Sequence, residues 1–568
     1  MADEKKGVRL LDPRGEPLKP QKPLAIATSA YNAPYDAADI YNEHMESWRP
    51  YLWSPDGELN MFRDRMVSRM RDLVRNDGWA SAAVTRTIDN VIGADFRPIP
   101  KPDYKALQAA TGIKGFDHVW AAEFAKTVGA LYRLWAYDVN RYCDRQRGQT
   151  FPQLQKLAFR HQLIDGDALA MLHWEERNVT SGKAPFATMV QIIDPDRLSN
   201  PQLQFDQRHM RGGVVVDDNG VAVGYYIRRA HAGDWFNADK SLRWDLIPRE
   251  TSWGRPIIVH YFDHDRAAQN RGGTGILTPV IQRLKMLIKY EGSELDAAII
   301  NAIFGAYIES PYDPAMVEEA MGDGEEMELG AYQNHRTEFH AQNRVTLGGS
   351  RLPILFPGEK INAVTAARPG MNFQAFESAM LRNVAAGAGL TTQQISQNWA
   401  EVNYSSFRAA SLEAWKTLGR RRTDFATGFS QPIFAALVEE MFDRNELPLP
   451  AGAPEFSKFR YAYARAHWQG PGKGYVDVVK ERQGAMIGMQ AGMTTLSQQT
   501  AELDGNDWEE VLEQRALEMQ RMEQLGLPLP QWIDPASKDD ASSVDAAPEG
   551  KTGSSDGSHD KSSTGYRS

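Results

Sequence analysis

Apolar and polar positions alternate along this chain in blocks, some with the period of a helix and some with that of a strand. Helical spacing covers three stretches in the first third of the chain, at 60–90, 120–146 and 150–163. Strand-like apolar runs follow at Ala168–His173, Ala187–Ile193 and Ile257–Phe262. Asn76-Asp77-Gly78 should divide the first stretch into two helices. We therefore expect an α+β block here.

The clearest local signal is a β-hairpin within this block. Val214–Val216 and Val221–Ile227 are apolar runs separated by Asp217-Asp218-Asn219-Gly220. The Asn-Gly pair readily takes the positive φ angles that a tight hairpin turn requires. The pattern therefore predicts two antiparallel strands joined by this turn.

The second half of the chain is mainly helical in pattern. One helix is expected from Leu277 to about Tyr307, with Pro279 in its first turn, and a second from Phe373 to Ala386. The segment between them, Ser310 to about Pro357, is rich in turn signals and has short strand candidates. The two helices are therefore separated by an insertion.

A longer helix is predicted from about Tyr404 to Arg444. Its apolar stripe has spacings of mostly three and four and comprises Trp415, Leu418, Phe425, Phe429, Ile433, Leu437 and Met441. Pro432 should kink or break it, because proline lacks the N–H group and clashes with the preceding turn. Near the end, Asp507 and Glu510 predict a capping box for a helix that runs to Leu525.

Composition limits the class of protein. The 568 residues are 42% hydrophobic and 24% charged, so the chain can bury a large core. Its formal net charge is -10, from 64 basic and 74 acidic groups. Proteins that hold nucleic acid tightly through phosphates are usually basic, so this balance argues against a tight DNA binder. It does not exclude a protein through which DNA slides.

Cysteine usage and the ends of the chain add further limits. Cys143 is the single cysteine, which excludes an intramolecular disulfide and indicates a core thiol in a reducing compartment. The first residues are polar and do not form a secretory signal, and the apolar stretch Ala297–Ile308 is too short to span a bilayer. We expect a soluble, intracellular protein with disordered tails.

Standard catalytic motifs are absent from the sequence. Gly470-Pro471-Gly472-Lys473-Gly474 has neither the glycine spacing nor the Ser/Thr of a phosphate-binding loop, so a turn is favoured. A cluster of His260, Asp263, His264 and Asp265 leaves a metal site or a hydrolase open as an alternative. The simpler interpretation of the cluster is a strand end followed by solvated or helix-capping acids.

Several motifs together resemble the portal proteins of tailed bacteriophages, in the lambda-type family. The similar segments, in family order, are RNDGWASAAVTRTIDNVIGADFRP (75–98), FRHQLIDGDALAMLHW (159–174), QIIDPDRLSNP (191–201), the hairpin at 212–229, the helix at 272–310, VNYSSFRAASLEAWKTLGRRR (402–422) and HWQGPGKGYVDVVKE (467–481). The resemblance covers about residues 40 to 530. It implies a portal fold, with an α+β wing, helical stem, small α/β clip and helical crown, assembled as a ring.

The resemblance also implies how the chain divides into domains. The expected order is an N-terminal tail (1–40), wing (41–272), first stem helix (273–309), clip (310–357), second stem helix (358–388), tunnel loop (389–403), helices that span wing and crown (404–470), crown (471–530) and a disordered tail (531–568). The clip could donate strands to neighbouring subunits.

The tunnel loop is the expected DNA-facing site. Its candidates are Gln393, Gln394, Gln397, Asn398 and Trp399. Amide side chains make weak, exchangeable contacts, whereas each Lys or Arg on a phosphate adds affinity and slows sliding. We expect the three residues Gln394, Gln397 and Asn398 to contact DNA.

Two clusters of basic residues are candidates for electrostatic contacts in the stem or between subunits of the ring. The first is Arg283, Lys285 and Lys289 on the first stem helix. The second is Arg420, Arg421 and Arg422, with Lys416 nearby. For the second group a solvated helix face paired with Glu413 and Asp424 is the favoured interpretation, and a DNA-facing or subunit-bridging patch is the alternative.

The resemblance implies partners as well. These are further copies of the chain in a ring, usually of twelve, double-stranded DNA that slides without sequence specificity, the terminase large subunit, the major capsid protein or scaffold, and head–tail connector or adaptor proteins. It implies no cofactor, metal, membrane or catalytic activity, and a place at the portal vertex of the virion after assembly in the host cytoplasm. Another phage connector or structural protein is the alternative.

Overall fold

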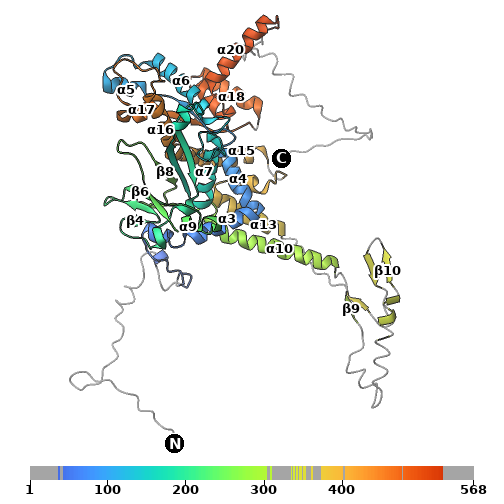
Figure 1. Cartoon of the computed structure of the whole chain (residues 1–568). Helices are drawn as coiled ribbons and strands as arrows, with labels where there is room; N and C mark the ends of the chain where they lie inside the picture. Colours follow the sequence, from blue (N-terminus) through green and yellow to red (C-terminus); the bar gives the residue numbers. More distant parts are fainter. Residues whose placement is uncertain are drawn as a thin grey trace, which may run out of the picture. The chain divides into compact units, whose positions relative to one another are not determined.

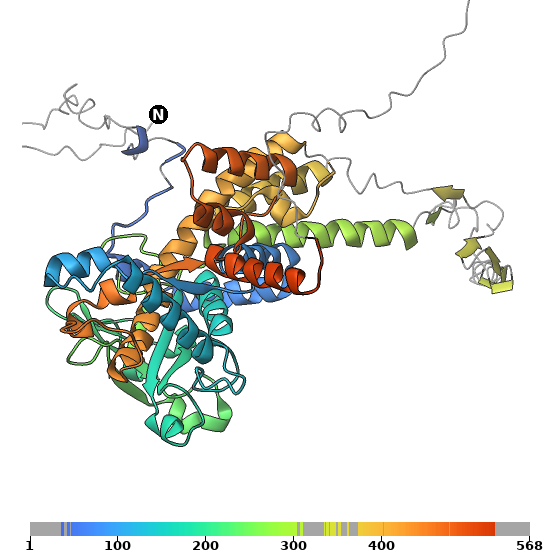
Figure 2. The same cartoon turned by 90° about the horizontal axis from the view of Figure 1, so that it is seen from above.

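The structure is a computed structural model of the chain (Figures 1 and 2). It describes residues 47–303, 373–400, 403–475 and 477–528, with short pieces at 36–38, 43–45, 307–309 and between 334 and 362. The chain divides into two compact units, one running to Asp477 and the other starting at Val478. The two units are considered separately.

Most of the described residues are helical. The helices of the first unit are α2 (Pro55–Leu59), α3 (Arg63–Asn76), α4 (Gly78–Val91), α5 (Tyr104–Thr111), α6 (His118–Ala136), α7 (Phe151–Asp165), α8 (Glu176–Thr180), α9 (Ala238–Ser241), α10 (Ile281–Ile303), α13 (Phe373–Ala388), α14 (Thr392–Ser396), α15 (Tyr404–Phe425), α16 (Gln431–Asp443) and α17 (Arg460–Ala464). Asp77 ends α3 and caps α4 by accepting the backbone N–H of Ala80, as the Asn-Asp-Gly signal predicts.

The strands form small antiparallel sheets. They are β1 (Arg97–Pro100), β2 (Asp167–Trp174), β3 (Thr188–Ile193), β4 (Met210–Arg211), β5 (Val214–Val216), β6 (Ala222–Arg228), β7 (Trp244–Pro248), β8 (Ile258–Phe262), β9 (Tyr307–Glu309), β10 (Arg344–Leu347), β11 (Ser350–Pro353), β12 (Lys360–Asn362) and β13 (Ala466–Gln469). The sheet orders are β3-β2-β8, β4-β5-β6-β7, β1-β13, β10-β11 and β12-β9. The predicted hairpin is β5–β6, so that prediction is confirmed.

The two larger sheets and the helices form three layers. One face of β2 presents Ala168, Ala170 and Leu172 to the main helical core, and the other presents Leu169 to a second core. That second core also contains Val214 of β5, so it lies between the two sheets. A strand buried on both faces has no polar alternation, which explains its continuous apolar sequence.

The helix predicted over 120–146 ends earlier than expected. α6 stops at Ala136, and Arg141 takes a φ angle of 59° in the turns that follow. The Asp144 carboxylate then accepts the backbone N–H groups of Gly148 and Gln149, at 2.7 and 3.0 Å. These side-chain bonds satisfy the backbone locally, and they favour a loop over a helix.

Helices α10 and α13 lie side by side (Figures 1 and 2). Leu284 and Leu287 of α10 are buried in the main core, and the ring of Tyr290 packs on Phe373 and Phe376 of α13. The helix–insertion–helix pattern predicted from the sequence is therefore present. Most of the turn-rich insertion at 310–357 lies outside the described residues, although its strand candidates include the described hairpin β10–β11, and almost all of the two predicted tails lies outside them as well.

The long helix predicted over 404–444 is interrupted just before Pro432. α15 ends at Phe425, a π-helical turn covers Ala426–Ser430, and α16 begins at Gln431 with Pro432 in its first turn. The rings of Phe425 and Phe429 stack at 5.0 Å across this turn. The wider turn accommodates a proline that would otherwise leave the carbonyl groups of the preceding turn without a partner.

The second unit consists of helices α18 (Val478–Gln490), α19 (Leu496–Gln499) and α20 (Trp508–Gln524). None of the residues in these three helices is buried. Asp507 caps α20 as predicted, but it does so through the backbone N–H of Glu509 and not through the predicted capping box with Glu510. Gly526 follows the helix with a φ angle of 67°, as the sequence predicts. No helix in the described part of the chain is long and apolar enough to cross a membrane.

Candidate nucleic-acid interface

The segment predicted as a tunnel loop, 389–403, contains a short helix, α14, that the sequence analysis does not assign. Thr391 and Gln394 form a capping box: the Gln394 N–H donates to Thr391 Oγ1 at 3.2 Å, and the Thr391 N–H donates to Gln394 Oε1 at 2.9 Å. The Thr-x-x-Gln spacing is the sequence signal for such a box. The Gln394 side chain thus holds the helix start.

α14 is anchored in the subunit body. Ile395 is 1% exposed and belongs to the main core together with Leu390. The short helix lies against α4 and α13, and Gly389 ends α13 with a φ angle of 69°. A five-residue helix is not stable alone, so this packing is what fixes it.

Three predicted site residues are brought together on the exposed turn after α14. Gln397 has a φ angle of 56° and donates from Nε2 to the Gln394 carbonyl at 2.7 Å. Asn398 Oδ1 accepts the N–H of Ala400 at 3.1 Å, and Trp399 packs edge-on against Phe407 at 5.1 Å. Trp399 remains 48% exposed. These exposed side chains therefore lie on a turn that follows α14, a helix packed into the core.

The other two candidates are less available. Gln393 and Gln394 are half-buried on α14, and the Gln394 oxygen is engaged in the cap. Of the five predicted side chains, Gln397, Asn398 and Trp399 are therefore the ones presented to a ligand.

The basic residues of α10 are all exposed. Leu284 and Leu287 point to the core, while Arg283, Lys285 and Lys289 lie on the exposed part of the helix. No ion pair joins any of these three to another described residue. Their charges are therefore available to solvent, DNA or a neighbouring subunit.

The Arg420–Arg422 run divides between surface and interior. The predicted solvated face is confirmed for Lys416 and Arg420, which pair with Glu413 and Asp424 at 2.9 Å each. It is wrong for Arg421, which donates to the Ala388 carbonyl at 2.8 Å. Burial lowers the pKa of this guanidinium.

Arg422 is also held inside the subunit. Its guanidinium donates to the carbonyls of Asn90, Val91 and Pro471 at 2.7, 3.1 and 2.9 Å, and burial lowers its pKa to about 10. It thus joins the end of α4 to the segment after β13. Arg420 is left as the exposed arginine of the run.

The His/Asp cluster does not converge on a site. The predicted strand end is β8, the acids Asp263 and Asp265 that follow it are exposed, and the His260 side chain turns inward, with its Nε2 2.9 Å from Asp167 Oδ1. Asp263 accepts from Gln162 and Tyr261, and His264 stacks on Phe262. Within the described residues, no group of three metal-ligating side chains is suited to hold an ion.

Sequence reasoning missed a buried ionic network around Asp167. This carboxylate, fully buried at the start of β2, accepts from Arg63 at 3.4 Å, Arg271 at 3.2 Å and the Gly272 N–H at 2.7 Å, in addition to His260. Burial alone would raise the pKa of Asp167, but the bond to His260 and the two arginine charges outweigh burial and lower it. The partners are about 100 residues away, so no local pattern reveals them.

The family of the chain follows from its sequence as a whole. A family model described as phage portal protein, lambda family, matches residues 41–422, which is more than half of the chain. The chain therefore belongs to the lambda family of phage portal proteins, a structural family.

Curated relatives agree with this assignment. Portal protein B of Escherichia phage lambda is 30% identical over 497 residues, which cover 87% of this chain and 90% of the relative. The portal protein of Escherichia phage N15 is also 30% identical, covering 87% and 91%. Among solved structures, the neck of an empty GTA particle computed with C6 symmetry aligns with a TM-score of 0.35 at 15% identity, over 76% of this chain and 96% of that chain.

Proposed function

We propose that this chain forms the ring-shaped channel at one vertex of a phage capsid, through which double-stranded DNA is packaged and later ejected. The proposal rests on membership of the lambda portal family. It includes the terminase large subunit as the packaging partner, the major capsid protein or scaffold as the shell partner, and head–tail connectors as later partners. It assigns no catalytic step to this chain.

The described elements fit this role as follows. Residues 41–272 would form the wing, α10 and α13 the stem, and the second unit the crown. The tunnel loop would be α14 together with the exposed turn 397–400. Because Ile395 anchors α14 in the core, the turn would meet DNA from a fixed position.

The observation that carries the DNA-facing assignment is the chemistry of this turn. Residues 397–400 are Gln, Asn, Trp and Ala, all exposed and none charged. Each cation on a phosphate releases counterions and adds affinity, so a neutral amide surface touches DNA with little resistance to sliding. The exposed Arg283, Lys285 and Lys289 of α10 would supply a weaker, solvated attraction along the stem.

Electron microscopy of the purified protein tests the proposal directly. End-on views should show a closed ring with a central channel, and counting the subunits in these views tests the expected twelve. A monomer or dimer at micromolar concentration would contradict the proposal. A short, wide ring without a stem would favour a head–tail connector instead.

A further inference from the structure

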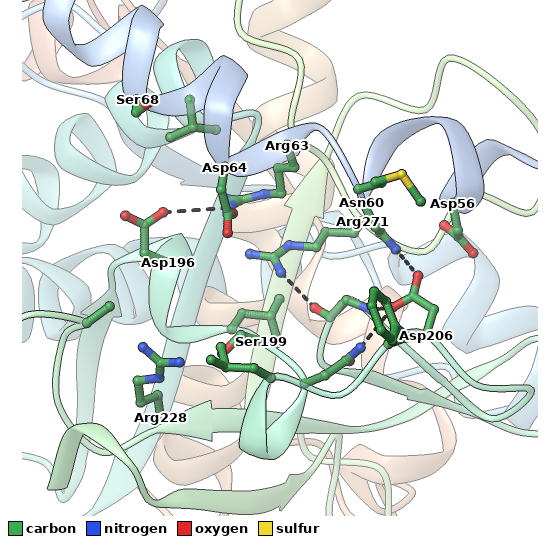
Figure 3. Close-up of a pocket in the computed structure, with 18 of the residues that line it drawn as sticks. Asp56, Asn60, Arg63, Asp64, Ser68, Asp196, Ser199, Asp206, Arg228 and Arg271 are labelled. Carbon is green, nitrogen blue, oxygen red and sulfur yellow. Dashed lines mark hydrogen bonds and ion pairs between the residues drawn. The ribbon is translucent and has the colours of Figure 1, made fainter. Parts of the chain in front are cut away.

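A cavity of about 870 Å³ opens on the first unit, away from the stem helices and the tunnel turn. α2 and the first turns of α3 form one wall, and the loops after β3 form another, with Arg228 of β6 at its base (Figure 3). Neither the ring channel nor the tunnel turn accounts for this cavity.

Arg228 is the distinctive residue of the cavity. It is only 7% exposed and its guanidinium lies over the Trp244 ring at 4.6 Å, yet it makes no hydrogen bond or ion pair with another described side chain. Figure 3 shows its side chain directed toward the space between Asp196 and Ser199. Burial lowers its pKa, while Asp64 and Asp196 attract its charge from a distance. A buried cation without a direct partner favours an anionic ligand.

Two further buried atoms that line the cavity have no hydrogen-bond partner among the described residues. They are Arg63 Nε, a donor, and Asn60 Oδ1, an acceptor. A ligand that satisfies all three groups must offer acceptors and at least one donor. A peptide does so, because carbonyl and carboxylate oxygens accept while its backbone N–H donates. Chloride and sulfate lack the donor.

The rim of the cavity is apolar and exposed. Met61, Leu203 and Phe205 are 67%, 76% and 89% exposed. Exposed apolar groups of this size, beside polar groups that can fix orientation, are typical of protein–protein contact sites. The cavity therefore fits a peptide that carries an acidic residue close to large apolar ones.

The chain itself has such a segment, which we term the N-terminal arm, residues 36–53. Trp48, Tyr51 and Leu52 of the arm are 69%, 81% and 95% exposed. The arm also contains Asp36, Asp39, Glu43 and Glu46, and Arg49 is its single Lys or Arg. Its acidic side chains match Arg228, and its apolar side chains match the rim. Aspartates also line the cavity, but Asp56, Asp64 and Asp196 are already paired with arginines.

We infer, building on the proposed ring, that the N-terminal arm of one copy binds the Arg228 cavity of the neighbouring copy. An acidic side chain of the arm pairs with Arg228, and its aromatic side chains cover Leu203 and Phe205. This contact joins one face of a subunit to a different face of the next. Such head-to-tail contacts are the kind that close a ring.

A second copy is the proposed partner because both surfaces are exposed in the copy that the structure describes. The arm joins α2 at the cavity wall, and Arg266 Nη1 holds the Trp53 carbonyl at 3.1 Å, which fixes the base of the arm. Within the described copy, the arm's Trp48 and Leu52 and the rim's Phe205 are all exposed.

A disulfide test separates the possibilities. One tagged population carries Leu52→Cys in the arm and a second, differently tagged, carries Phe205→Cys at the rim, with buried Cys143 unchanged in both. Rings assembled from the mixture should give a disulfide-linked dimer that contains both tags. A control pair of Leu52→Cys with Val221→Cys, which is exposed on the hairpin, should not. A double variant carries Leu52→Cys and Phe205→Cys in one chain, and an intrachain disulfide in it would overturn the inference. The absence of a cross-link above the control in verified rings would overturn it as well.

Charge variants test the role of Arg228. Arg228→Met should lower the cross-linking rate about tenfold, which corresponds to the loss of one charge-assisted hydrogen bond. Exposed Arg208→Met is the matched control. An arm in which Asp36, Asp39, Glu43 and Glu46 become the corresponding amides leaves the folded cavity intact and should give the same loss. Unchanged cross-linking in both variants would remove the charge pairing from the inference.

The two proposals can fail separately. If the wild-type chain forms no ring in the microscope, the proposed portal function is wrong. If it forms rings that show neither the cross-link nor any change on removal of residues 1–53, only the arm contact is wrong.

Discussion

Asp167 shows how much of this subunit depends on one carboxylate. It accepts hydrogen bonds from α3, β8 and the segment that leads to α10, so it joins four parts of the first unit at a single point. Two arginines and a histidine meet it inside the protein. A buried charge of this kind costs desolvation energy, and only a complete set of partners offsets that cost.

Asp167→Asn should lower the free energy of unfolding by about 3–5 kcal/mol, because buried Arg271 would lose the carboxylate it pairs with, while Arg63 would keep only Asp64 and Asp196. Urea denaturation at neutral pH measures the change. Asp218→Asn, at a carboxylate that is 77% exposed and pairs only with exposed Arg208 and His209 among the described residues, is the control and should change stability by less than about 1 kcal/mol.

Asp167 should also make the free energy of unfolding depend on pH in the acid range. The pKa of Asp167 is lowered in the folded state, so below about pH 4 the unfolded chain binds a proton that the native state excludes. Its contribution is complete above about pH 5 and is lost progressively as the pH falls. The acid slope of stability should be shallower in Asp167→Asn than in wild type, and equal slopes would contradict the assignment.

The Cys143 thiol should be unreactive toward alkylating reagents in the native protein. It is fully buried, and burial together with Asp144 and Asp138 raises the pKa of its thiol to about 12. The reactive species is the thiolate, so a maleimide at pH 7 should label the folded protein negligibly and the urea-unfolded protein completely. Rapid labelling of native protein would show that the loop around Asp144 opens.

At the scale of elements, the hydrophobic period locates helices better than it locates their ends. α3, α4, α7 and α10 occur where the pattern places them, because each has a long apolar face and a recognisable start or stop. The end of α6 was missed because the side-chain bonds of Asp144 decide it. α14 was missed although its Thr-x-x-Gln box is visible in the sequence, since its stability comes from packing and not from length.

Some features of the candidate site could be predicted from the sequence and others could not. The exposed turn 397–400 could be found from its amide-rich composition. The internal roles of Arg421 and Arg422 could not, because the carbonyls that Arg422 binds at Asn90 and Val91 are more than 300 residues away in sequence. The spacing of charges shows that a charged face exists, but it does not show what packs against that face.

Gly428 in the π-helical turn and Gly419 on α15 form a matched pair for substitution by alanine. A Cβ atom at Gly428 would lie 2.3 Å from the Tyr261 ring, whereas one at Gly419 on α15 would meet nothing within 4 Å. Gly428→Ala should destabilise the subunit by about 1–3 kcal/mol through this overlap. Gly419→Ala should stabilise it by up to about 1 kcal/mol through helix propensity. Thermal unfolding of both variants measures the difference, and equal shifts would mean that Tyr261 moves aside freely.

At the scale of the proposed ring, any charge on the exposed turn 397–400 is repeated by every subunit. Gln397→Lys with Asn398→Lys should leave rings intact but retard packaging, and the delay should shrink as salt rises because counterion release weakens. Gln397→Ala with Asn398→Ala should form rings yet alter packaging or genome retention. Gln108→Ala, at an exposed amide on α5, is the control for both. Normal DNA-filled particles from both double variants would contradict the tunnel assignment.

The approach of α10 to the sheet has a mechanical consequence. At the corner between α7 and β2, a Cβ atom on Gly166 would lie 2.2 Å from the Gly273 nitrogen, and one on Gly275 would lie 2.5 Å from the Ile164 carbonyl oxygen. Backbone therefore lies directly on backbone here, without a layer of side chains that could yield between them. A displacement along α10 would therefore be transmitted to β2 through backbone contacts that side chains cannot absorb. The segment that leads to α10 and the start of β2 should therefore move together, so that strain along α10 passes to the sheet.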